Sequence, residues 1–119
     1  MGNIFKALHK TNYMIIKCEK KTFNVIKADT FLKQVLGLMF RFPKENGLIL
    51  WFNKEKYVAL HTFFVFFPID IIYLNNDKEV VKIRRNIKPF IALIPHVKCK
   101  YIVELKNAEN VKLKDKFSF

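Results

Sequence analysis

The groups best able to do chemistry in this chain lie between His61 and Asp70. The segment reads His-Thr-Phe-Phe-Val-Phe-Phe-Pro-Ile-Asp, so an imidazole, a hydroxyl and a carboxylate stand in a run that is otherwise almost wholly apolar. Burying an imidazole or a charge without partners is costly, so His61 and Asp70 need a structural or a functional reason to be there. Polar groups set among aromatic side chains are also the usual make-up of a ligand pocket.

The sequence predicts a ligand-binding site built from Arg41, His61, Thr62, Phe63 and Asp70. Arg41 stands at the end of an expected helix, where a cation is favourable, and its guanidinium also fits a carboxylate or a phosphate. Asp70 either accepts hydrogen bonds from Arg41 or from backbone N–H groups, or takes part in binding. His61 is either a hydrogen-bonded core histidine or a group that titrates near neutral pH in the pocket. We expect Arg41, His61 and Asp70 to converge on one cavity.

Two further residues have simpler expected roles. Glu104 falls on the outward side of an alternating strand, so we expect its carboxylate to be solvated. Trp51, like Phe63, is expected either in the core or as a wall of the pocket.

The composition excludes most of the familiar sets of catalytic residues and cofactor-binding motifs. The chain has one serine, which is next to last, and only three glycines, so it is no serine hydrolase and has neither a P-loop nor a dinucleotide-binding fingerprint. Its three histidines stand in unrelated contexts, with no pair at metal-ligand spacing. We therefore expect no catalytic residues, no metal and no cofactor. One enzymatic alternative stays open, in which His61 and Asp70 form an acid–base pair.

The formal net charge of +12 raises the question of a nucleic-acid partner. Eleven basic and four acidic residues lie in 1–60, and eleven and six in 61–119, so the excess is spread along the chain. Only 82–88 looks like a local basic patch, and no charge block marks a binding arm. The simplest interpretation is that lysine keeps the protein soluble. Nucleic-acid binding through lysine-rich faces stays open as an alternative.

One stretch, 58–74, is long enough to consider as a membrane span. It is at the short limit of length and contains a histidine, a proline and an aspartate, and its Phe, Ile and Val suit buried strands equally well. No signal peptide is visible in 1–12. We therefore expect a cytoplasmic protein without a membrane span.

Cys18 and Cys99 match no zinc spacing and no redox pair. We expect reduced thiols. A bridge stays open if the first and late strands lie together, since geometry decides it.

The apolar pattern predicts one domain over 1–119, in which 1–12 is either part of the fold or a loosely ordered N-terminal segment. Apolar residues recur at helical spacing over 29–42, and Pro43 ends that helix. The fold class is therefore mainly β with one helix (α+β): a small barrel or sandwich of mostly antiparallel strands with an amphipathic helix packed against it. The expected strands cover 13–18, 22–27, 48–52, 57–67, 69–74, 79–85, 100–106 and 111–117.

The order of several short motifs carries a family resemblance. The chain has Gly-Leu-Met-Phe-Arg at 37–41, Gly-Leu-Ile-Leu-Trp-Phe at 47–52, His-Thr-Phe-Phe at 61–64, Pro-Ile-Asp-Ile-Ile-Tyr-Leu at 68–74 and Tyr-Ile-Val-Glu-Leu at 101–105. Over nearly its whole length the chain resembles the prokaryotic family named domain of unknown function 192, in its archaeal-type form. The resemblance implies a small β-barrel-like fold with one packed helix, and no activity that can be read from it.

Three departures from the family pattern stand out. Val65 replaces the usual Met, Lys106-Asn107-Ala108 replaces a Pro-Ala-Gly, and Lys114-Asp115 replaces a Gly-Asp. The last two weaken any functional role for the C-terminal turn.

These observations predict a non-catalytic binding domain for a small molecule or an anion. Its pocket is expected between the helix end and the His61–Asp70 segment.

Overall fold

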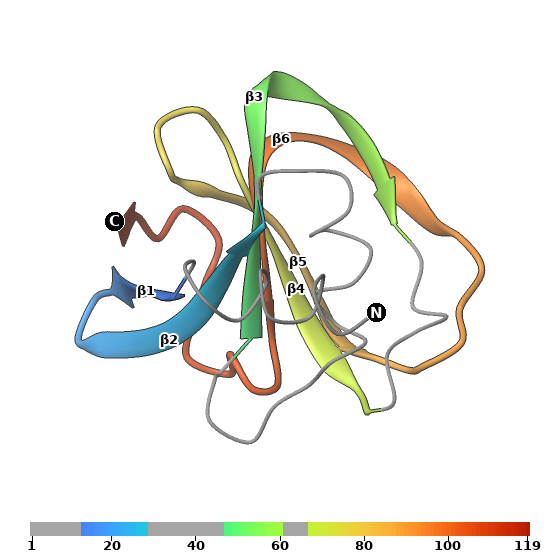
Figure 1. Ribbon diagram of the computed structural model, residues 1–119, viewed down its shortest axis with the longest axis horizontal. Coiled ribbons are helices and arrows are strands. Elements are labelled where there is room, and N and C mark those ends of the chain that lie inside the picture. Colours follow the sequence, from blue (N-terminus) through green and yellow to red (C-terminus); the bar gives the residue numbers. More distant parts are fainter. Residues whose placement is uncertain (1–12, 29–46, 61–66) are drawn as a thin grey trace, which may run out of the picture.

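The computed structural model describes residues 13–28, 47–60 and 67–119, which form one seven-stranded sheet (Figure 1). The strand order is β5-β4-β6-β3-β2-β1-β7. Strands β2 and β3 are parallel, and every other neighbouring pair is antiparallel. The strands are β1 (Tyr13–Cys18), β2 (Lys21–Ala28), β3 (Gly47–Leu60), β4 (Ile69–Leu74), β5 (Val80–Ile87), β6 (Ile94–Leu105) and β7 (Phe117–Ser118).

This architecture corrects the predicted fold class. The described residues are all β and contain no helix, and their sheet is open and mixed where a closed barrel or sandwich with a packed helix was predicted. The expected helix at 29–42 lies outside the described residues. Alternation in a sequence identifies strands but not the order in which they pair, and it gave no sign that β2 and β3 would run parallel. No helix in the described ranges is long and apolar enough to cross a membrane.

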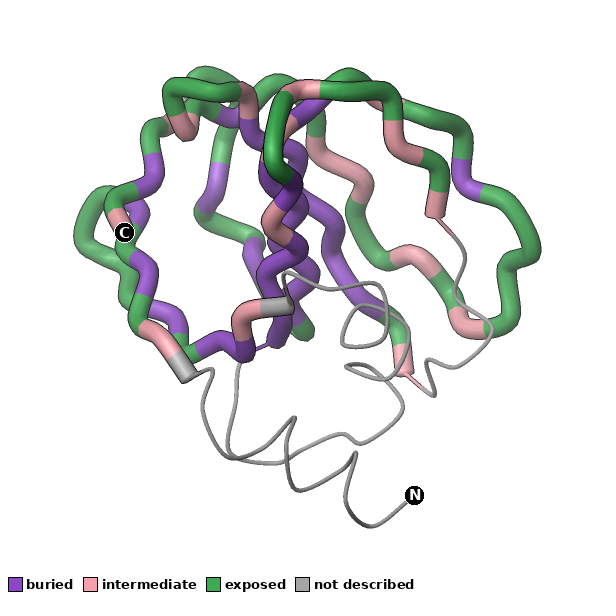
Figure 2. The backbone as a smooth tube through the Cα atoms, turned by 45° about the horizontal axis from the view of Figure 1, so that its top comes forward, coloured by how far each residue is buried: buried purple, intermediate pink, exposed green. Residues whose placement is uncertain are grey.

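The central strands are buried on both faces. All six residues of β4 are buried, as are the last five of β6. Figure 2 shows the buried positions gathered along these strands. One face carries the first core, made of Ile16, Cys18, Phe23, Val25, Ile49, Ile72, Leu74, Val80, Tyr101, Val103, Leu105, Ala108, Val111 and Phe117. The other carries the second core, made of Ile26, Leu48, Leu50, Phe52, Ile69, Ile71, Tyr73, Ile94, Cys99 and Ile102.

The outer halves of β3 and β6 curl away from the centre of the sheet (Figure 1). Their register shifts between Trp51 and Lys56, and extra residues of this kind bend a strand pair and increase its twist. Phe52, Ile94 and Cys99 on these halves belong to the second core. The curled halves therefore extend the second core beyond the flat part of the sheet.

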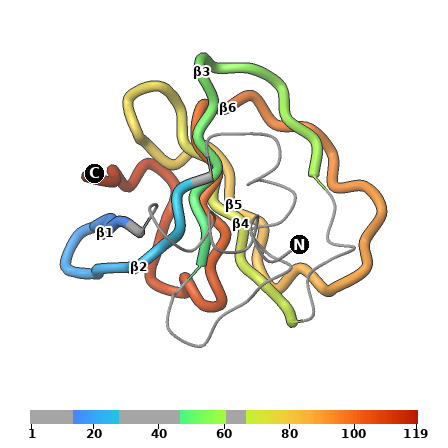
Figure 3. Tube along the Cα trace, in the orientation of Figure 1, coloured from blue at the N-terminus to red at the C-terminus, as the bar shows by residue number. Residues whose placement is uncertain are grey.

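The C-terminal segment covers the first core. It runs beside the β1–β2 hairpin, at the other end of the chain (Figure 3), and β7 pairs with β1. Backbone bonds also join it to the start of β5: the Val80 N–H donates to the Asp115 carbonyl at 2.8 Å, and the Lys114 N–H to the Val80 carbonyl at 2.9 Å. Turns in this segment occupy most of 111–117, which was predicted to be the last strand.

The two cysteines are free and lie in different cores, so the alternative of a bridge between them is wrong. Burial raises the pKa of the Cys99 thiol to about 12. Burial and the neighbouring Asp115 carboxylate raise the pKa of Cys18 to about 12 as well. Both side chains are protonated at neutral pH.

Candidate functional site

Asp70 is held by the main chain on the first-core side of β4. Its register partner on β6, Leu105, belongs to the first core. Asp70 Oδ1 accepts from the Asn86 N–H and Oδ2 from the Ala108 N–H, each at 2.8 Å. Asn86 has φ 52°, a left-handed conformation that asparagine tolerates well. Of the roles expected for Asp70, the acceptor of backbone hydrogen bonds is the one observed.

Arg85 reinforces this clamp from the neighbouring strand. Its Nη1 donates to the Ala108 carbonyl at 2.8 Å, and its Nη2 donates to the Val111 carbonyl. The loop after β6 is thus held through its backbone: the Ala108 N–H donates to Asp70, and the carbonyls of Ala108 and Val111 accept from Arg85. Both oxygens of Asp70 are occupied, so its geometry gives no support to a role as a general base.

The other predicted site residues, Arg41, His61, Thr62 and Phe63, lie outside the described residues, and their convergence with Asp70 stays a prediction. The described residues on either side of the 61–66 segment are Leu60 and Phe67. Both pack against the second core.

Glu104 was predicted to be solvated, and that prediction is wrong. Its side chain is 3% exposed. On β6 it pairs with Leu48 of β3 and Ile71 of β4, both of the second core. Alternation marks a solvated face only where one side of a sheet meets water, whereas this part of β6 is covered on both sides. Trp51 packs against the first core, with its ring edge-to-face with Tyr101 at 5.2 Å, so its core role is the one observed.

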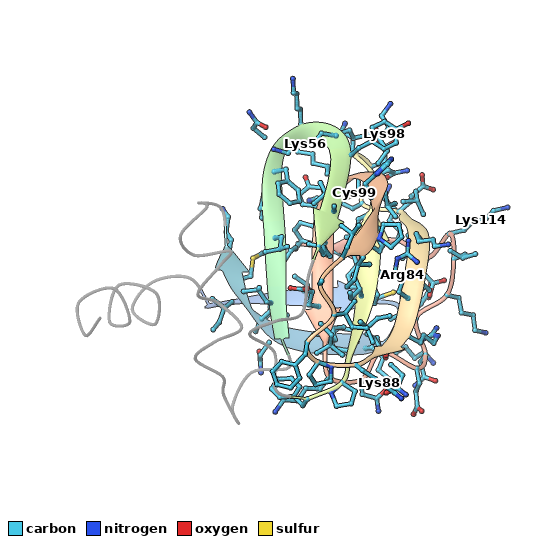
Figure 4. All side chains as sticks on the ribbon, turned by 90° about the vertical axis from the view of Figure 1, so that its right-hand side faces the viewer. Lys56, Arg84, Lys88, Lys98, Cys99 and Lys114 are labelled. Carbon is cyan, nitrogen blue, oxygen red and sulfur yellow. The ribbon has the colours of Figure 1, made fainter. Side chains whose placement is uncertain are left out.

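Sequence reasoning missed a pair of polar side chains on the second-core side, Tyr73 and Arg84. Tyr73 is fully buried. Arg84 pairs with Ile71 across the β4–β5 ladder, and its Cζ lies 6.0 Å from the centroid of the Tyr73 ring. Neither Tyr73 Oη nor Arg84 Nε has a partner of hydrogen-bond geometry among the described residues, although the guanidinium approaches the hydroxyl. Figure 4 labels Arg84.

The outer end of Arg84 reaches the surface. Its Nη2 donates to the Pro95 carbonyl over 3.4 Å, a long hydrogen bond in an exposed setting. The side chain therefore leads from solvent to the buried Tyr73 hydroxyl. The available signal was a tyrosine in the otherwise apolar run Ile71–Leu74 of β4, but its contact with Arg84 depends on the pairing of β4 with β5.

Burial raises the pKa of Tyr73, and the nearby Arg84 guanidinium offsets part of this rise. The Glu104 carboxylate acts in the same direction as burial. Tyr73 is therefore a neutral hydroxyl at pH 7. In the row that runs across the sheet, Ile71 lies between Arg84 and Glu104, so the backbones of these two residues are about 10 Å apart. We refer to Tyr73, Arg84 and Glu104 as the polar cluster.

A second polar surface lies on the curled end of β3 and β6. Tyr57 is 68% exposed, and its ring meets the His96 ring edge-on at 5.2 Å. Tyr57 is paired in register with the exposed Lys98 on one side of the strands, and the neighbouring exposed Lys56 lies on the other side, with its ammonium over the Phe52 ring of the second core (Figure 4). We refer to Tyr57, His96, Lys98 and Lys56 as the basic arm.

No group of three or more His, Cys, Asp and Glu side chains is placed to hold a metal ion within 13–28, 47–60 and 67–119.

Comparison with known proteins gives the same family as the sequence motifs. The family model DUF192 (Uncharacterized ACR) matches residues 14–114. The chain is 40% identical over 78 residues to the UPF0127 protein of Pyrococcus furiosus and 36% identical over 78 residues to that of Pyrococcus horikoshii. These matches cover 65% of this chain, and 66% and 67% of the two relatives, so the chain spans about two thirds of their length.

Two crystal structures share the fold. A protein of unknown function from Novosphingobium aromaticivorans has a TM-score of 0.79 at 22% identity, with 90% of this chain and 85% of that one covered. A Sinorhizobium meliloti protein has a TM-score of 0.75 at 19% identity, with 92% and 96% covered. With the fold shared and the family model matched over most of its length, the chain belongs to the DUF192 family, whose archaeal members it resembles in sequence.

Proposed function

We propose that this protein is a non-catalytic binding domain that holds a small molecule against the second core. The observation that carries the proposal is a pair of buried donors, Tyr73 Oη and Arg84 Nε, for which the described residues supply no hydrogen-bond partner. An unsatisfied buried polar group costs about 1–3 kcal/mol, so a fold that keeps two of them side by side has a reason beyond stability. A bound ligand would satisfy both.

The predicted site joins this region through the chain. The segment from His61 to Phe63 follows Leu60, and Phe67 leads into β4; both flanking side chains pack against the second core. We propose that His61, Thr62 and Phe63, together with Arg41, contribute to the same binding site. Asp70 would act indirectly, because its carboxylate anchors the start of the strand that carries Tyr73.

A thermal-shift screen against metabolites and anions tests this function. We expect at least one compound to raise Tm of the wild type, and the shift to be reduced in Arg84→Gln and in His61→Ala. Lys20→Gln is the control, because it removes one exposed positive charge far from the second core. A screen in which no compound stabilises the wild type would contradict the proposal, and so would shifts that persist unchanged in both variants.

A second candidate function is binding of single-stranded nucleic acid by the basic arm. Tyr57 supplies an exposed aromatic ring beside the exposed Lys98, and such a pair can stack a base and neutralise a phosphate. Titration with oligonucleotides at about 150 mM salt decides between the candidates. Retained affinity that falls in Tyr57→Ala and Lys98→Gln would favour the basic arm. Affinity that vanishes at this salt concentration, or that does not change with salt below it, would exclude it.

A further inference from the structure

We propose that Tyr73 and Arg84 form the carboxylate subsite of a site for an apolar monocarboxylic acid. The inference rests on the binding function proposed above and names the class of ligand. Three features of the second-core side carry it: the kind of unpartnered atoms, the balance of buried charge, and the apolar surroundings.

The first feature is that the unpartnered atoms are hydrogen-bond donors. Arg84 Nε–H can only donate, and burial keeps the Tyr73 hydroxyl protonated at neutral pH. Because the guanidinium lies close to the hydroxyl, one acceptor oxygen can receive both. A carboxylate oxygen is the strongest acceptor of this kind, since hydrogen bonds between ionised groups are shorter and stronger than neutral ones.

The second feature is the balance of charge. The polar cluster carries one guanidinium and one carboxylate, and Glu104 is close enough to Tyr73 to raise its pKa. A dianion such as phosphate would place its second charge in the field of the buried Glu104. A ligand with a single negative charge matches Arg84 and meets less repulsion from Glu104.

The third feature is the apolar surroundings. Ile71 and Ile102, the register partners of Arg84 and Tyr73, are completely buried. At the rim of the second core, further apolar side chains are only partly buried: Val58, Leu60, Phe67, Ile87 and Val97. An aliphatic body would cover this rim while its carboxylate reaches the two donors. The exposed end of this pair is the outer end of Arg84, whose hydrogen bond to the Pro95 carbonyl is long, at 3.4 Å.

Calorimetric titration with octanoate, 1-octanol and inorganic phosphate tests the ligand class. We expect octanoate to bind at least about tenfold more tightly than the other two, a difference that corresponds to one hydrogen bond with a charged group. Tyr73→Phe and Arg84→Gln should each weaken octanoate binding by about tenfold. Two matched controls should leave it unchanged: Tyr101→Phe, which lies in the first core, and Lys20→Gln.

Nuclear magnetic resonance on the wild-type protein gives a second measurement that needs no variant to fold. The Nε–H resonance of Arg84 should move on addition of octanoate and exchange more slowly with water. The Nε–H resonance of Arg85, which lies on the clamp at the loop after β6, should stay in place.

The outcomes separate this inference from the binding function. Tighter binding of phosphate, or equal binding of octanol and octanoate, would overturn the monocarboxylate class and leave the binding function standing. No binding of octanoate, with an unmoved Arg84 resonance, would also overturn it. The binding function falls if the broad metabolite screen is blank, or if the shifts it finds persist unchanged in Arg84→Gln and His61→Ala.

Discussion

The two cores of this protein lie on opposite faces of the same strands and differ in what they enclose. The first core is apolar, and the buried carboxylate beside it, Asp70, accepts hydrogen bonds from two backbone N–H groups. The C-terminal segment covers this core and is held to the start of β5 by backbone hydrogen bonds. The second core contains Tyr73 of the polar cluster and lies beside Arg84 and Glu104. Among the described residues it leaves two donors without partners, and the apolar side chains at its rim are partly exposed. One face of the sheet is therefore built for stability and the other, we propose, for binding.

The largest change in the free energy of unfolding is expected from substitutions at two adjacent residues of β4. Ile72 and Ile71 are both completely buried, but Ile72 belongs to the first core and Ile71 to the second. We expect Ile72→Ala to lower the free energy of unfolding by about 4 kcal/mol and Ile71→Ala by about 2 kcal/mol, because the less closed second core relaxes more easily around the space. Urea denaturation measures both. Equal losses, or a larger loss for Ile71→Ala, would remove the mechanical distinction between the cores.

The clamp at Asp70 comes next in size. Asp70→Ala leaves the N–H groups of Asn86 and Ala108 without their acceptor, so we expect a loss of about 3 kcal/mol. The matched control is Asp77→Ala in an exposed turn, which should cost less than about 0.5 kcal/mol. Chemical denaturation of both variants checks this. Similar small losses at the two positions would mean that the clamp does not hold the first core.

The elements that follow from local chemistry were predictable, and those that depend on distant partners were not. The first hairpin and the strand Ile69–Leu74 are where the apolar pattern predicted them, and the turn at Asn75 follows from side chains that bond their own backbone. The open sheet, its parallel pair and the burial of Glu104 depend on which strands become neighbours. The pattern of a single strand does not contain that information.

The candidate site divides in the same way. The chemistry of Asp70 was foreseen because a carboxylate after Pro68 in an apolar run needs partners. Tyr73 looked like one more apolar residue of β4, and Arg84 like part of a solubilising basic patch. Their meeting depends on the register of β4 and β5, which contains bulges that no sequence rule places.

The cysteines provide a smaller comparison, since each core holds one. The folded pKa of each thiol, about 12, lies above its ordinary value of 9.0, so stability is fully present below pH 9 and falls as the pH rises from 9 towards 12. In that window each thiol should lower the free energy of unfolding by up to about 1.4 kcal/mol per pH unit. Unfolding measured at a series of pH values should show a shallower decline in Cys18→Ala and in Cys99→Ala. Slopes identical to that of the wild type would contradict the protonated, buried state.

The free energy of unfolding of Tyr73→Phe is the sharpest test of the division between a stabilising and a binding face, although the expected change is the smallest. The substitution removes only a hydroxyl for which the described residues of the second core supply no hydrogen-bond partner. We predict that stability is unchanged or rises by up to about 1 kcal/mol, because a buried polar atom without a partner is lost and the ring is kept. Tyr101→Phe in the first core serves as the reference. A loss of more than about 1 kcal/mol in Tyr73→Phe would show that the hydroxyl is satisfied in the free protein, and would contradict the division between a stabilising and a binding face.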